Sequence, residues 1–246
     1  MILFAGLFLL SGWKVWELIQ TYQEGTNTYT QLEQYATFEE TQPTQEPEAE
    51  SETQEAASTP PPLADFDALS AINDEIVGWI YIPDTTIHYP VVQGADNNYY
   101  LTHLFDGTKN SSGSIFLDYR CAADFSSSHS ILYGHHMKNG SMFAGLTAYK
   151  EQDFYDNHPT GWLSTPAGDY EIRFFSGYVA SNKDIAWNLN LNQQNLPRWL
   201  TEVGEKSCFQ SSQIPSPTDS ILTLSTCTYE FNDAKFVLHG FLVPAH

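Results

Sequence analysis

The sequence contains the stretch Ile221-Leu222-Thr223-Leu224-Ser225-Thr226-Cys227-Thr228-Tyr229-Glu230, an apolar, β-prone run that leads into a cysteine. Such a run predicts a strand, and hydroxyl side chains flank the thiol at its end. A structural cysteine is usually surrounded by apolar neighbours, whereas a thiol among Ser and Thr at a strand end lies where a substrate can reach it. Because a thiolate is a strong nucleophile that a nearby cation or base activates, Cys227 is the first candidate for chemistry.

A second β-like run also ends in reactive side chains, in Ile131-Leu132-Tyr133-Gly134-His135-His136-Met137. Two strands that end on the same face of a barrel would bring His135 near Cys227. An imidazole beside a thiol can act as general base and then as general acid. A single histidine at a strand end is more often an ordinary polar residue. We expect no metal, because adjacent strand residues point to opposite faces and no third ligand follows at a short spacing.

A cation, Lys235, follows Cys227 by eight residues. The segment from Thr228 to Ala234 has the character of a loop between two strands, and a hairpin of that length could place the cation close to the thiol. A cation there could stabilise an oxyanion or hold a substrate carbonyl. On spacing alone, a solvated loop lysine is the favoured interpretation.

The composition excludes some classes of partner. The chain has 246 residues and a formal net charge of −20. That charge argues against nucleic acid, because neutralising phosphates requires clustered Lys and Arg. The sequence contains no Gly-rich phosphate loop, and we expect no cofactor. The three cysteines leave at least one free thiol in a monomer, and a Cys121–Cys208 disulfide is possible although the sequence alone does not support it.

Residues 1–20 are predicted to form a transmembrane anchor. The run from Ile2 to Leu10 is almost wholly apolar and the apolar character continues beyond it, which approaches the roughly 20 residues that a membrane span needs. Trp13 and Trp16 suit a membrane interface, where Lys14 can extend to water. A cleaved signal peptide is the alternative, but neither a basic start nor a small-residue cleavage site is clear. We therefore expect an uncleaved, single-pass anchor in the cell membrane, with the rest of the chain extracellular.

Residues 21–62 are predicted to connect this anchor to a folded domain at residues 63–246. The connection begins as a helical stalk and continues as a disordered acidic linker rich in Pro, Gln and Thr, which cannot bury enough apolar surface to fold. The domain has predicted strands at 76–82, 87–92, 114–118, 130–133, 170–179, 221–225 and 236–243, and predicted helices at 65–69, 141–150 and 193–206. Many short strands with few helices predict a mainly β, closed or nearly closed barrel.

Three motifs together resemble those of the sortases, most closely class B: Tyr-Gly-His-His-Met…Ser-Met-Phe, Thr-Leu-Ser-Thr-Cys-Thr-Tyr-Glu-Phe and Phe-Val-Leu-His-Gly. The resemblance covers about Ile72 to Val243. Papain-like cysteine proteases place Cys before His, so the order here argues against them. The resemblance implies a closed β-barrel of about eight strands with peripheral helices, behind a membrane anchor and a linker.

The resemblance also implies an activity. Sortases are cysteine transpeptidases that cleave a sorting signal near the C-terminus of secreted proteins. They join the new C-terminus to an amine of a peptidoglycan precursor or of a pilin. The resemblance implies that Cys227 is the nucleophile and that His135 is the general acid and base. In the class B members that this chain most resembles, an arginine stands where Lys235 stands. Lys235 is the expected cation for the substrate carbonyl or oxyanion, without arginine's paired donors. The alternative is that Arg120, Arg173 or Arg198 takes the place of that arginine in space.

Further candidates for substrate binding or oxyanion support are Ser225 and Thr226, through hydroxyl or backbone donors, and Glu230, which would orient the loop or the substrate. For the two hydroxyl residues, a role as ordinary strand residues is equally compatible. The helix at 193–206 would wall a substrate groove, or simply pack on the barrel. Two alternatives to a transpeptidase are a weakly active or non-catalytic module that binds sorting peptides, suggested by Lys235, and a surface cysteine protease.

Overall fold

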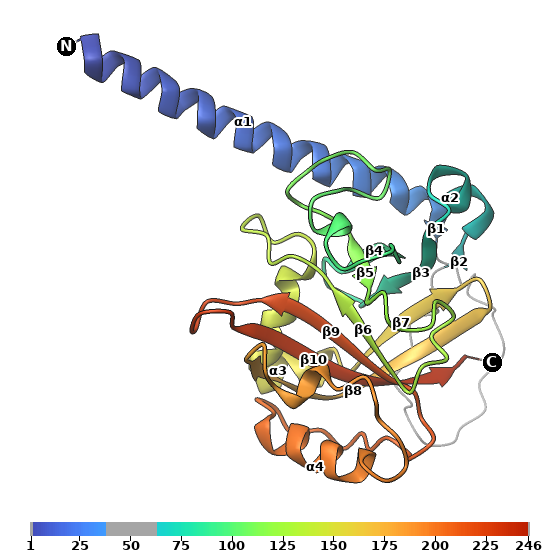
Figure 1. The fold of residues 1–246 in the computed structure, drawn as a ribbon. Coiled ribbons are helices and arrows are strands. Elements are labelled where there is room, and N and C mark those ends of the chain that lie inside the picture. Colours follow the sequence, from blue (N-terminus) through green and yellow to red (C-terminus); the bar gives the residue numbers. More distant parts are fainter. Residues whose placement is uncertain (1, 38–62, 246) are drawn as a thin grey trace, which may run out of the picture.

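A closed barrel of eight strands is the centre of the molecule (Figure 1). The computed structural model describes residues 2–37 and 63–245, so the predicted disordered linker from residue 38 onward lies outside the described residues. Around the barrel the strand order is β10-β8-β7-β3-β4-β5-β6-β9. The strands are β3 (Ile76–Tyr81), β4 (His88–Val92), β5 (Ile115–Leu117), β6 (His129–Tyr133), β7 (Thr160–Thr165), β8 (Gly168–Ala180), β9 (Ile221–Cys227) and β10 (Lys235–Pro244). The predicted mainly β, closed barrel is confirmed.

The strand β7 is the one barrel strand that the sequence pattern did not predict. Its residues Thr160-Gly161-Trp162-Leu163-Ser164-Thr165 include only two large apolar side chains, so the local β signal is weak. The strand forms because it pairs antiparallel with both β3 and β8, and Leu163, opposite Ile80, is fully buried. Tertiary pairing therefore overrides a weak local preference.

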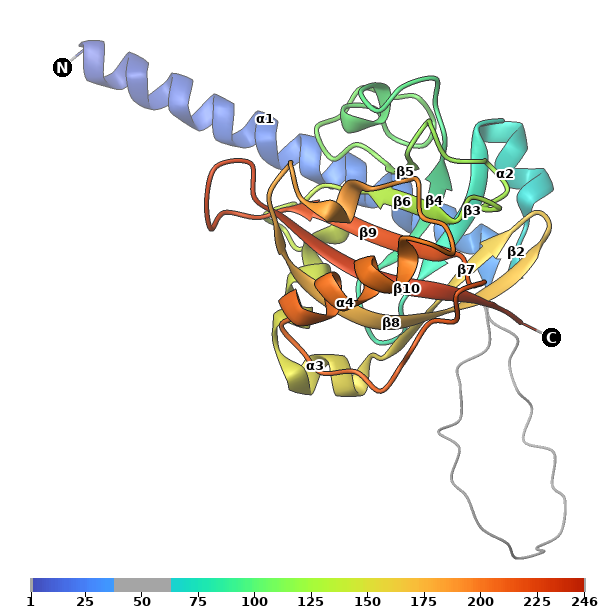
Figure 2. The same ribbon diagram turned by 60° about the horizontal axis from the view of Figure 1, so that its bottom comes forward.

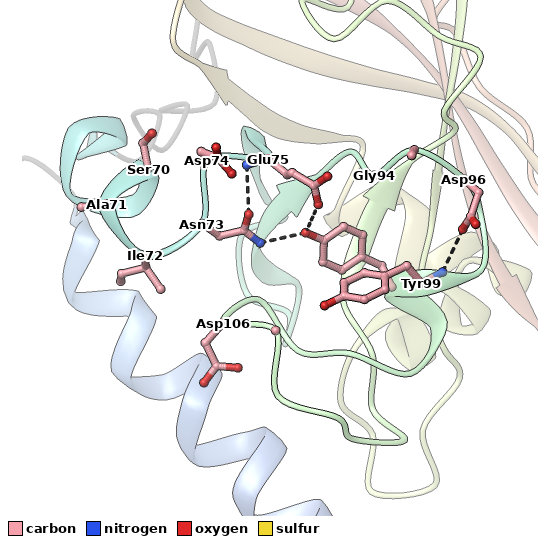
Figure 3. Close-up of a pocket in the computed structure, with 13 residues that line it drawn as sticks. Ser70, Ala71, Ile72, Asn73, Asp74, Glu75, Gly94, Asp96, Tyr99 and Asp106 are labelled. Carbon is pink, nitrogen blue, oxygen red and sulfur yellow. Dashed lines mark hydrogen bonds between the residues drawn. The ribbon is translucent and has the colours of Figure 1, made fainter.

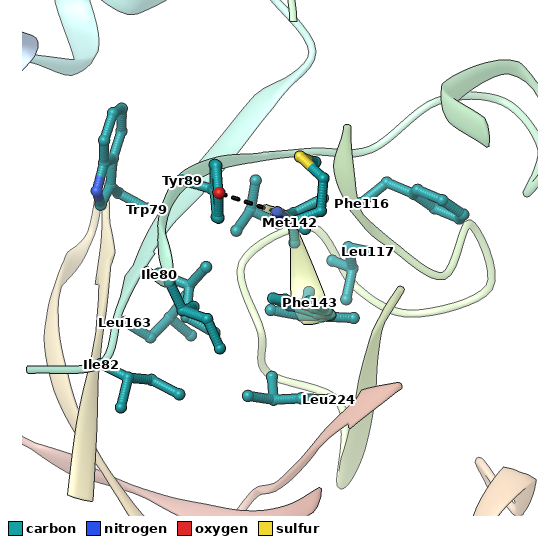
Figure 4. Close-up of a cluster of buried hydrophobic side chains, with 14 of the residues drawn as sticks. Trp79, Ile80, Ile82, Tyr89, Phe116, Leu117, Met142, Phe143, Leu163 and Leu224 are labelled. Carbon is teal, nitrogen blue, oxygen red and sulfur yellow. Dashed lines mark hydrogen bonds between the residues drawn. The ribbon is translucent and has the colours of Figure 1, made fainter. Parts of the chain in front are cut away.

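The alternation of side chains along β9 decides which residues face the barrel interior. Leu222 and Leu224 belong to the core inside the barrel, whereas Thr223 and Ser225 point to the outer side, where both are also buried. Cys227 lies on the outward side of this alternation. Figure 4 shows part of the interior, in which Phe143 lies among Leu117, Leu163 and Leu224.

Short helices surround the barrel. They are η1 (Glu33–Tyr35), α2 (Phe66–Ile72), η2 (Tyr99–Leu101), η3 (Phe143–Lys150), α3 (Gln152–Asn157), η4 (Ile185–Trp187) and α4 (Leu196–Lys206). The predicted helix at 141–150 is a 3₁₀ helix, and α3 was not predicted. The predicted helix at 193–206 begins at Leu196 with a proline in its first turn, where a missing N–H costs no intrahelical bond. Trp199 and Val203 of α4 pack on the outer face of the barrel, as the packing interpretation predicted.

The helix α1 (Ile2–Leu32) runs without interruption through the expected boundary near residue 20. Its N-terminal half projects away from the barrel in both views (Figures 1 and 2). Its C-terminal half packs on the barrel side, where Tyr29 Oη donates to Gly113 O at 2.5 Å and Asn110 Nδ2 donates to Thr21 O at 2.9 Å. Two-residue strands β1 (Ala36–Thr37) and β2 (Leu63–Ala64) then pair antiparallel. Within the described residues, no helix is long and apolar enough to cross a membrane, so the anchor stays a prediction.

Candidate active site

The thiol of Cys227 lies against the cation of Lys235. The two residues face each other across the antiparallel pair β9–β10, and side chains directly opposite in such a pair share one face. Lys235 Nζ lies 3.2 Å from Cys227 Sγ. The thiol is partly exposed at the end of its strand. The predicted proximity of these two groups is therefore present, and the positive charge can stabilise negative charge on the sulfur or on an adjacent oxygen.

The loop between β9 and β10 is held in place from both ends. Thr228 N donates to Ala234 O at 3.0 Å, which closes the hairpin next to the thiol. Glu230 accepts a hydrogen bond from Thr228 Oγ1 at 2.5 Å and forms an ion pair with Lys150 at the end of η3. The bond from Lys150, followed by the bond from Thr228, lowers the pKa of Glu230 to about 2. Glu230 thus links the loop to Lys150 through these two contacts, and its predicted role toward a substrate stays a prediction.

His135 and His136 follow the end of β6, which pairs with β9, so both lie near the end of β9 that carries the thiol. These strands run parallel with Tyr133 opposite Ser225, and Gly134 N continues the ladder by donating to Ser225 O at 3.1 Å. His136 Nδ1 then donates to Cys227 O at 3.0 Å. The sequence interpretation treated His136 only as the neighbour of His135, so this backbone contact was missed.

The ring of His135 has a different partner. His135 Nε2 donates to Leu101 O at 2.7 Å, because a carbonyl oxygen can only accept. In the neutral ring this leaves Nδ1 as the nitrogen that can take a proton. Within residues 2–37 and 63–245, His135 makes no hydrogen bond to the thiol. If the side chains continue to alternate beyond Tyr133, His135 points to the outer side of the barrel. Cys227 points to the same side.

The loop that follows His135 is fixed by backbone contacts. Phe143 N donates to His135 O at 2.9 Å, and His136 forms an isolated β-bridge with Met142. Met142 has a positive φ of 57°, which is unfavourable for a residue with a Cβ. Its amide donates to Tyr89 Oη at 2.9 Å, a bond that is drawn in Figure 4. The core therefore holds the turn that positions both imidazoles.

The hydroxyls of Ser225 and Thr226 lie on opposite sides of β9. Both are buried, and neither has a hydrogen-bond partner within the part of the chain that the structure describes. Ser225 points to the same side as Cys227, although its hydroxyl oxygen is buried. Thr226 points with Leu224 toward the interior, so its hydroxyl is turned away from the thiol.

A buried chain of imidazoles lies behind the site and was not anticipated. His129 Nδ1 donates to Asn188 O at 2.8 Å, so in the neutral ring its Nε2 must accept, and Thr223 Oγ1 donates to it at 2.7 Å. His239 Nδ1 then donates to Thr223 Oγ1 at 2.7 Å. These bonds join β6, β9 and β10 to the segment that precedes α4. The signal that could have found them is the period of two, which places Thr223 and Cys227 on one side of β9.

Burial keeps both of these histidines neutral. Burial is the largest influence on each ring and lowers the pKa of His129 to about 4 and that of His239 well below its ordinary value. The proton order along the chain leaves His239 Nε2 as a bare acceptor, and this atom has no partner among the described residues. An additional proton would have to bind at this buried atom, and burial disfavours the charge that it would bring.

The other cysteines and the cavities do not add groups to this site. All three cysteines are free; Cys121 is buried and Cys208 is exposed. A cavity of about 710 Å³ lies beside α2, with Asp74, Glu75 and Asp96 on its walls (Figure 3), but Cys227 does not line it. Within the described residues, no group of His, Cys, Asp or Glu could hold a metal ion.

The buried imidazoles predict a pH-dependent stability. Because their pKa values are lower in the folded than in the unfolded chain, the unfolded state binds more protons between about pH 6.5 and pH 4. The free energy of unfolding should therefore fall as the pH is lowered through this window, which urea unfolding at pH 7.5, 6 and 5 measures. His239→Phe should reduce this pH slope, whereas the control His103→Gln should keep it. An equal slope in His239→Phe and the parent would contradict the prediction.

The chain is similar to known proteins over most of its length. It matches the sortase family, described as a sortase domain, over residues 80–243. Sortase B of Listeria monocytogenes is 33% identical over 244 residues, which are 97% of this chain and 93% of that protein. The crystal structure of sortase B from Bacillus anthracis in complex with AAEK1 has a TM-score of 0.75 at 31% identity, covering 92% of this chain and 100% of that one. The Staphylococcus aureus sortase B–substrate complex has a TM-score of 0.70 at 33% identity, covering 74% and 85% of the two chains. This chain therefore belongs to the sortase family of cysteine transpeptidases, and its relatives are class B sortases.

Proposed function

We propose that this chain cleaves a sorting signal of secreted proteins and joins the new C-terminus to an amine of the cell wall or of a pilin. The observation that carries the proposal is the 3.2 Å contact between Lys235 Nζ and Cys227 Sγ, at an accessible strand end that also receives His135 and His136. A thiol with a cation beside it and an imidazole within the same loop region has the groups that acyl transfer requires.

The proposed reaction proceeds in two steps. Cys227, as thiolate, attacks the carbonyl carbon of the scissile peptide bond, and Lys235 stabilises the oxyanion that forms. The C–N bond breaks as His135 donates a proton to the leaving amine, which leaves a thioacyl enzyme. An acceptor amine then attacks the same carbon, its proton passes to His135, and the C–S bond breaks to restore the thiolate. Ser225 supports the bound carbonyl through its unpartnered hydroxyl.

The substrate class is supported by the relatives. One of the similar structures is a complex of Staphylococcus aureus sortase B with its substrate, at 33% identity to this chain. That similarity covers 74% of this chain, and the sortase family match over residues 80–243 includes the segments that carry the thiol, the histidines and Lys235. We infer that this chain takes a peptide substrate of the same kind.

We further propose that the catalytic domain is held outside the cell by α1 in the cell membrane. The support is the apolar N-terminal sequence and the exposure of Trp13, Trp16 and Ile19, which are 60%, 58% and 46% exposed on the projecting half of the helix. Apolar side chains that face water in the isolated chain are stabilised by a membrane.

The proposed activity predicts transfer as well as cleavage. The purified domain should cleave fluorogenic peptides with sorting-type motifs, and an added amine should be joined to the new C-terminus, as mass spectrometry of the products would show. Cys227→Ala should abolish both. Cleavage that persists in Cys227→Ala would remove the thiol from the mechanism. Cleavage without amine incorporation would indicate a protease, and a parent that binds peptides without cleaving them would indicate a binding module.

The two histidines should contribute unequally. His135→Gln should lower kcat/KM by about 10²–10⁴-fold, the usual contribution of a general acid or base. His136→Gln removes a bond to the Cys227 carbonyl and should cost about tenfold or less, the effect of about one hydrogen bond. Steady-state cleavage of one peptide by both variants gives the comparison. A larger loss in His136→Gln than in His135→Gln would reverse the assignment.

The positive charge at position 235 should be required for activity. Lys235→Met should lower kcat by about 10²–10³-fold, as expected when one oxyanion donor is removed. Lys235→Arg keeps the charge and adds a paired donor, so it should preserve or raise the rate. Thermal unfolding of each variant controls for misfolding. Complete loss of activity in a folded Lys235→Arg variant would contradict the role given to Lys235.

A further inference from the structure

The ring of His135 is held by a backbone oxygen of η2. His135 Nε2 donates to Leu101 O at 2.7 Å, although the two residues are 34 positions apart in the chain. The bond leaves Nδ1 as the nitrogen that can exchange a proton with a substrate. It also persists when the ring is protonated, because both nitrogens then donate. One orientation of the ring therefore suits both steps of the proposed reaction, provided that Leu101 O stays in place.

The helix that carries this oxygen is attached to the protein mainly through its middle residue. η2 (Tyr99–Leu101) is a single 3₁₀ turn, and a turn of this kind has weak internal hydrogen bonds. Tyr99 and Leu101 are 45% and 38% exposed, whereas Tyr100 is 2% exposed. The position of Leu101 O therefore depends on Tyr100, the residue that directly precedes it.

The hydroxyl of Tyr100 is fixed by a closed network with Glu75 and Asn73, which we call the Tyr100 network. Tyr100 Oη donates to Glu75 Oε2 at 2.5 Å and accepts from Asn73 Nδ2 at 2.8 Å, and both bonds are drawn in Figure 3. Glu75 N donates to Asn73 Oδ1 at 2.9 Å, which closes the network. Burial raises the pKa of Tyr100, so the hydroxyl keeps the proton that it donates. The network ties η2 to the end of α2 and to the segment that leads into β3.

The backbone of η2 also lies close against the segment before β5. Ser114 N donates to Tyr100 O at 2.9 Å. Gly113 has a positive φ of 59°, and a Cβ at this position would lie 2.5 Å from Tyr100 O and 2.9 Å from Leu101 O. Only a glycine lets the two segments approach this closely. The carbonyl that holds His135 is therefore packed against one fixed segment, while the Tyr100 network ties the preceding side chain to another.

We propose that Tyr100 is a positioning residue for the reaction: its hydroxyl, bonded to Glu75 and Asn73, fixes η2 so that Leu101 O holds His135 with Nδ1 free for proton transfer. The proposal rests on the proposed function, since it concerns the acid and base of that reaction. Tyr100 acts through His135 and not through the substrate. Its loss should therefore lower kcat and leave KM unchanged.

Steady-state cleavage of a sorting peptide tests the network. Tyr100→Phe removes the hydroxyl and keeps the aromatic ring, and it should lower kcat about tenfold, the effect of about one hydrogen bond. Tyr99→Phe, which removes a hydroxyl of the same helix outside the network, is the matched control and should change neither kcat nor KM. Glu75→Leu should lower kcat as Tyr100→Phe does, whereas Glu75→Gln keeps an oxygen acceptor and should retain most of the parent rate. Equal losses in these two Glu75 variants, or a change confined to KM, would overturn the proposal.

A double-mutant cycle separates positioning of His135 from a general structural role. In the His135→Gln background, Tyr100→Phe should cause no further loss of kcat, because the side chain through which it acts is absent. The same tenfold loss in both backgrounds would show that Tyr100 acts independently of His135, and it would overturn the proposal.

The ring ¹⁵N NMR signals of His135, identified by their absence in His135→Gln, give a readout without turnover. They are recorded at a pH above which they no longer change, where the ring is neutral. In the parent and in Tyr99→Phe, Nε2 should have the shift of a nitrogen that carries a proton and Nδ1 that of one that does not. In Tyr100→Phe, the two shifts should move toward each other as both tautomers become populated.

This pattern would support the positioning role even if the parent cleaves no peptide, in which case the proposed function alone fails. A parent whose proton lies on Nδ1, or equal ring shifts in Tyr100→Phe and the parent, would overturn the proposal whatever the activity.

Discussion

The site depends on the pairing of β9 with two strands at once. β6 pairs with it in parallel and β10 pairs with it antiparallel, so three chain segments share one register. A slip of one residue would turn Cys227 toward the interior and Leu224 toward the outer side of the strand, because side chains alternate with a period of two. The burial of Leu222 and Leu224 in the core opposes that slip. The same packing that stabilises the barrel therefore sets the direction of the thiol.

The charged residues of the site lie at the surface, and the neutral histidines are buried. At the surface, the ion pair between Lys150 and Glu230 holds the loop that ends at Lys235, beside the thiol. On the same outer face of the strands but covered by Trp199 of α4, His129 and His239 are buried without charge and are joined through Thr223. A charge in that buried position would be costly, because no group of opposite sign among the described residues is bonded to either ring. The neutral network ties the strands to the segment before α4, and the exposed charges remain free for chemistry.

Local patterns predicted the features that depend on neighbouring residues. Seven of the barrel strands and the hairpin loop from Thr228 to Ala234 follow from apolar runs and from one short connection. Spacing alone favoured a solvated lysine at position 235, and the pairing of β9 with β10 places it beside Cys227 instead. Weak local signals failed where distant partners decide the structure. β7 forms between β3 and β8 despite few apolar residues, and α3 is a short helix with little periodicity.

The sequence by itself determined the chemical groups and the barrel. Cys227 and Lys235 are identified directly, and the alternation of side chains along each strand depends only on neighbouring residues. Only the tertiary structure decided which histidine contacts the thiol segment, since His135 and His136 differ by their partners Leu101 and Cys227, which are distant in the chain. It also decided that α1 packs on the barrel. Contacts between distant segments depend on how the barrel closes, and no local pattern of residues contains that information.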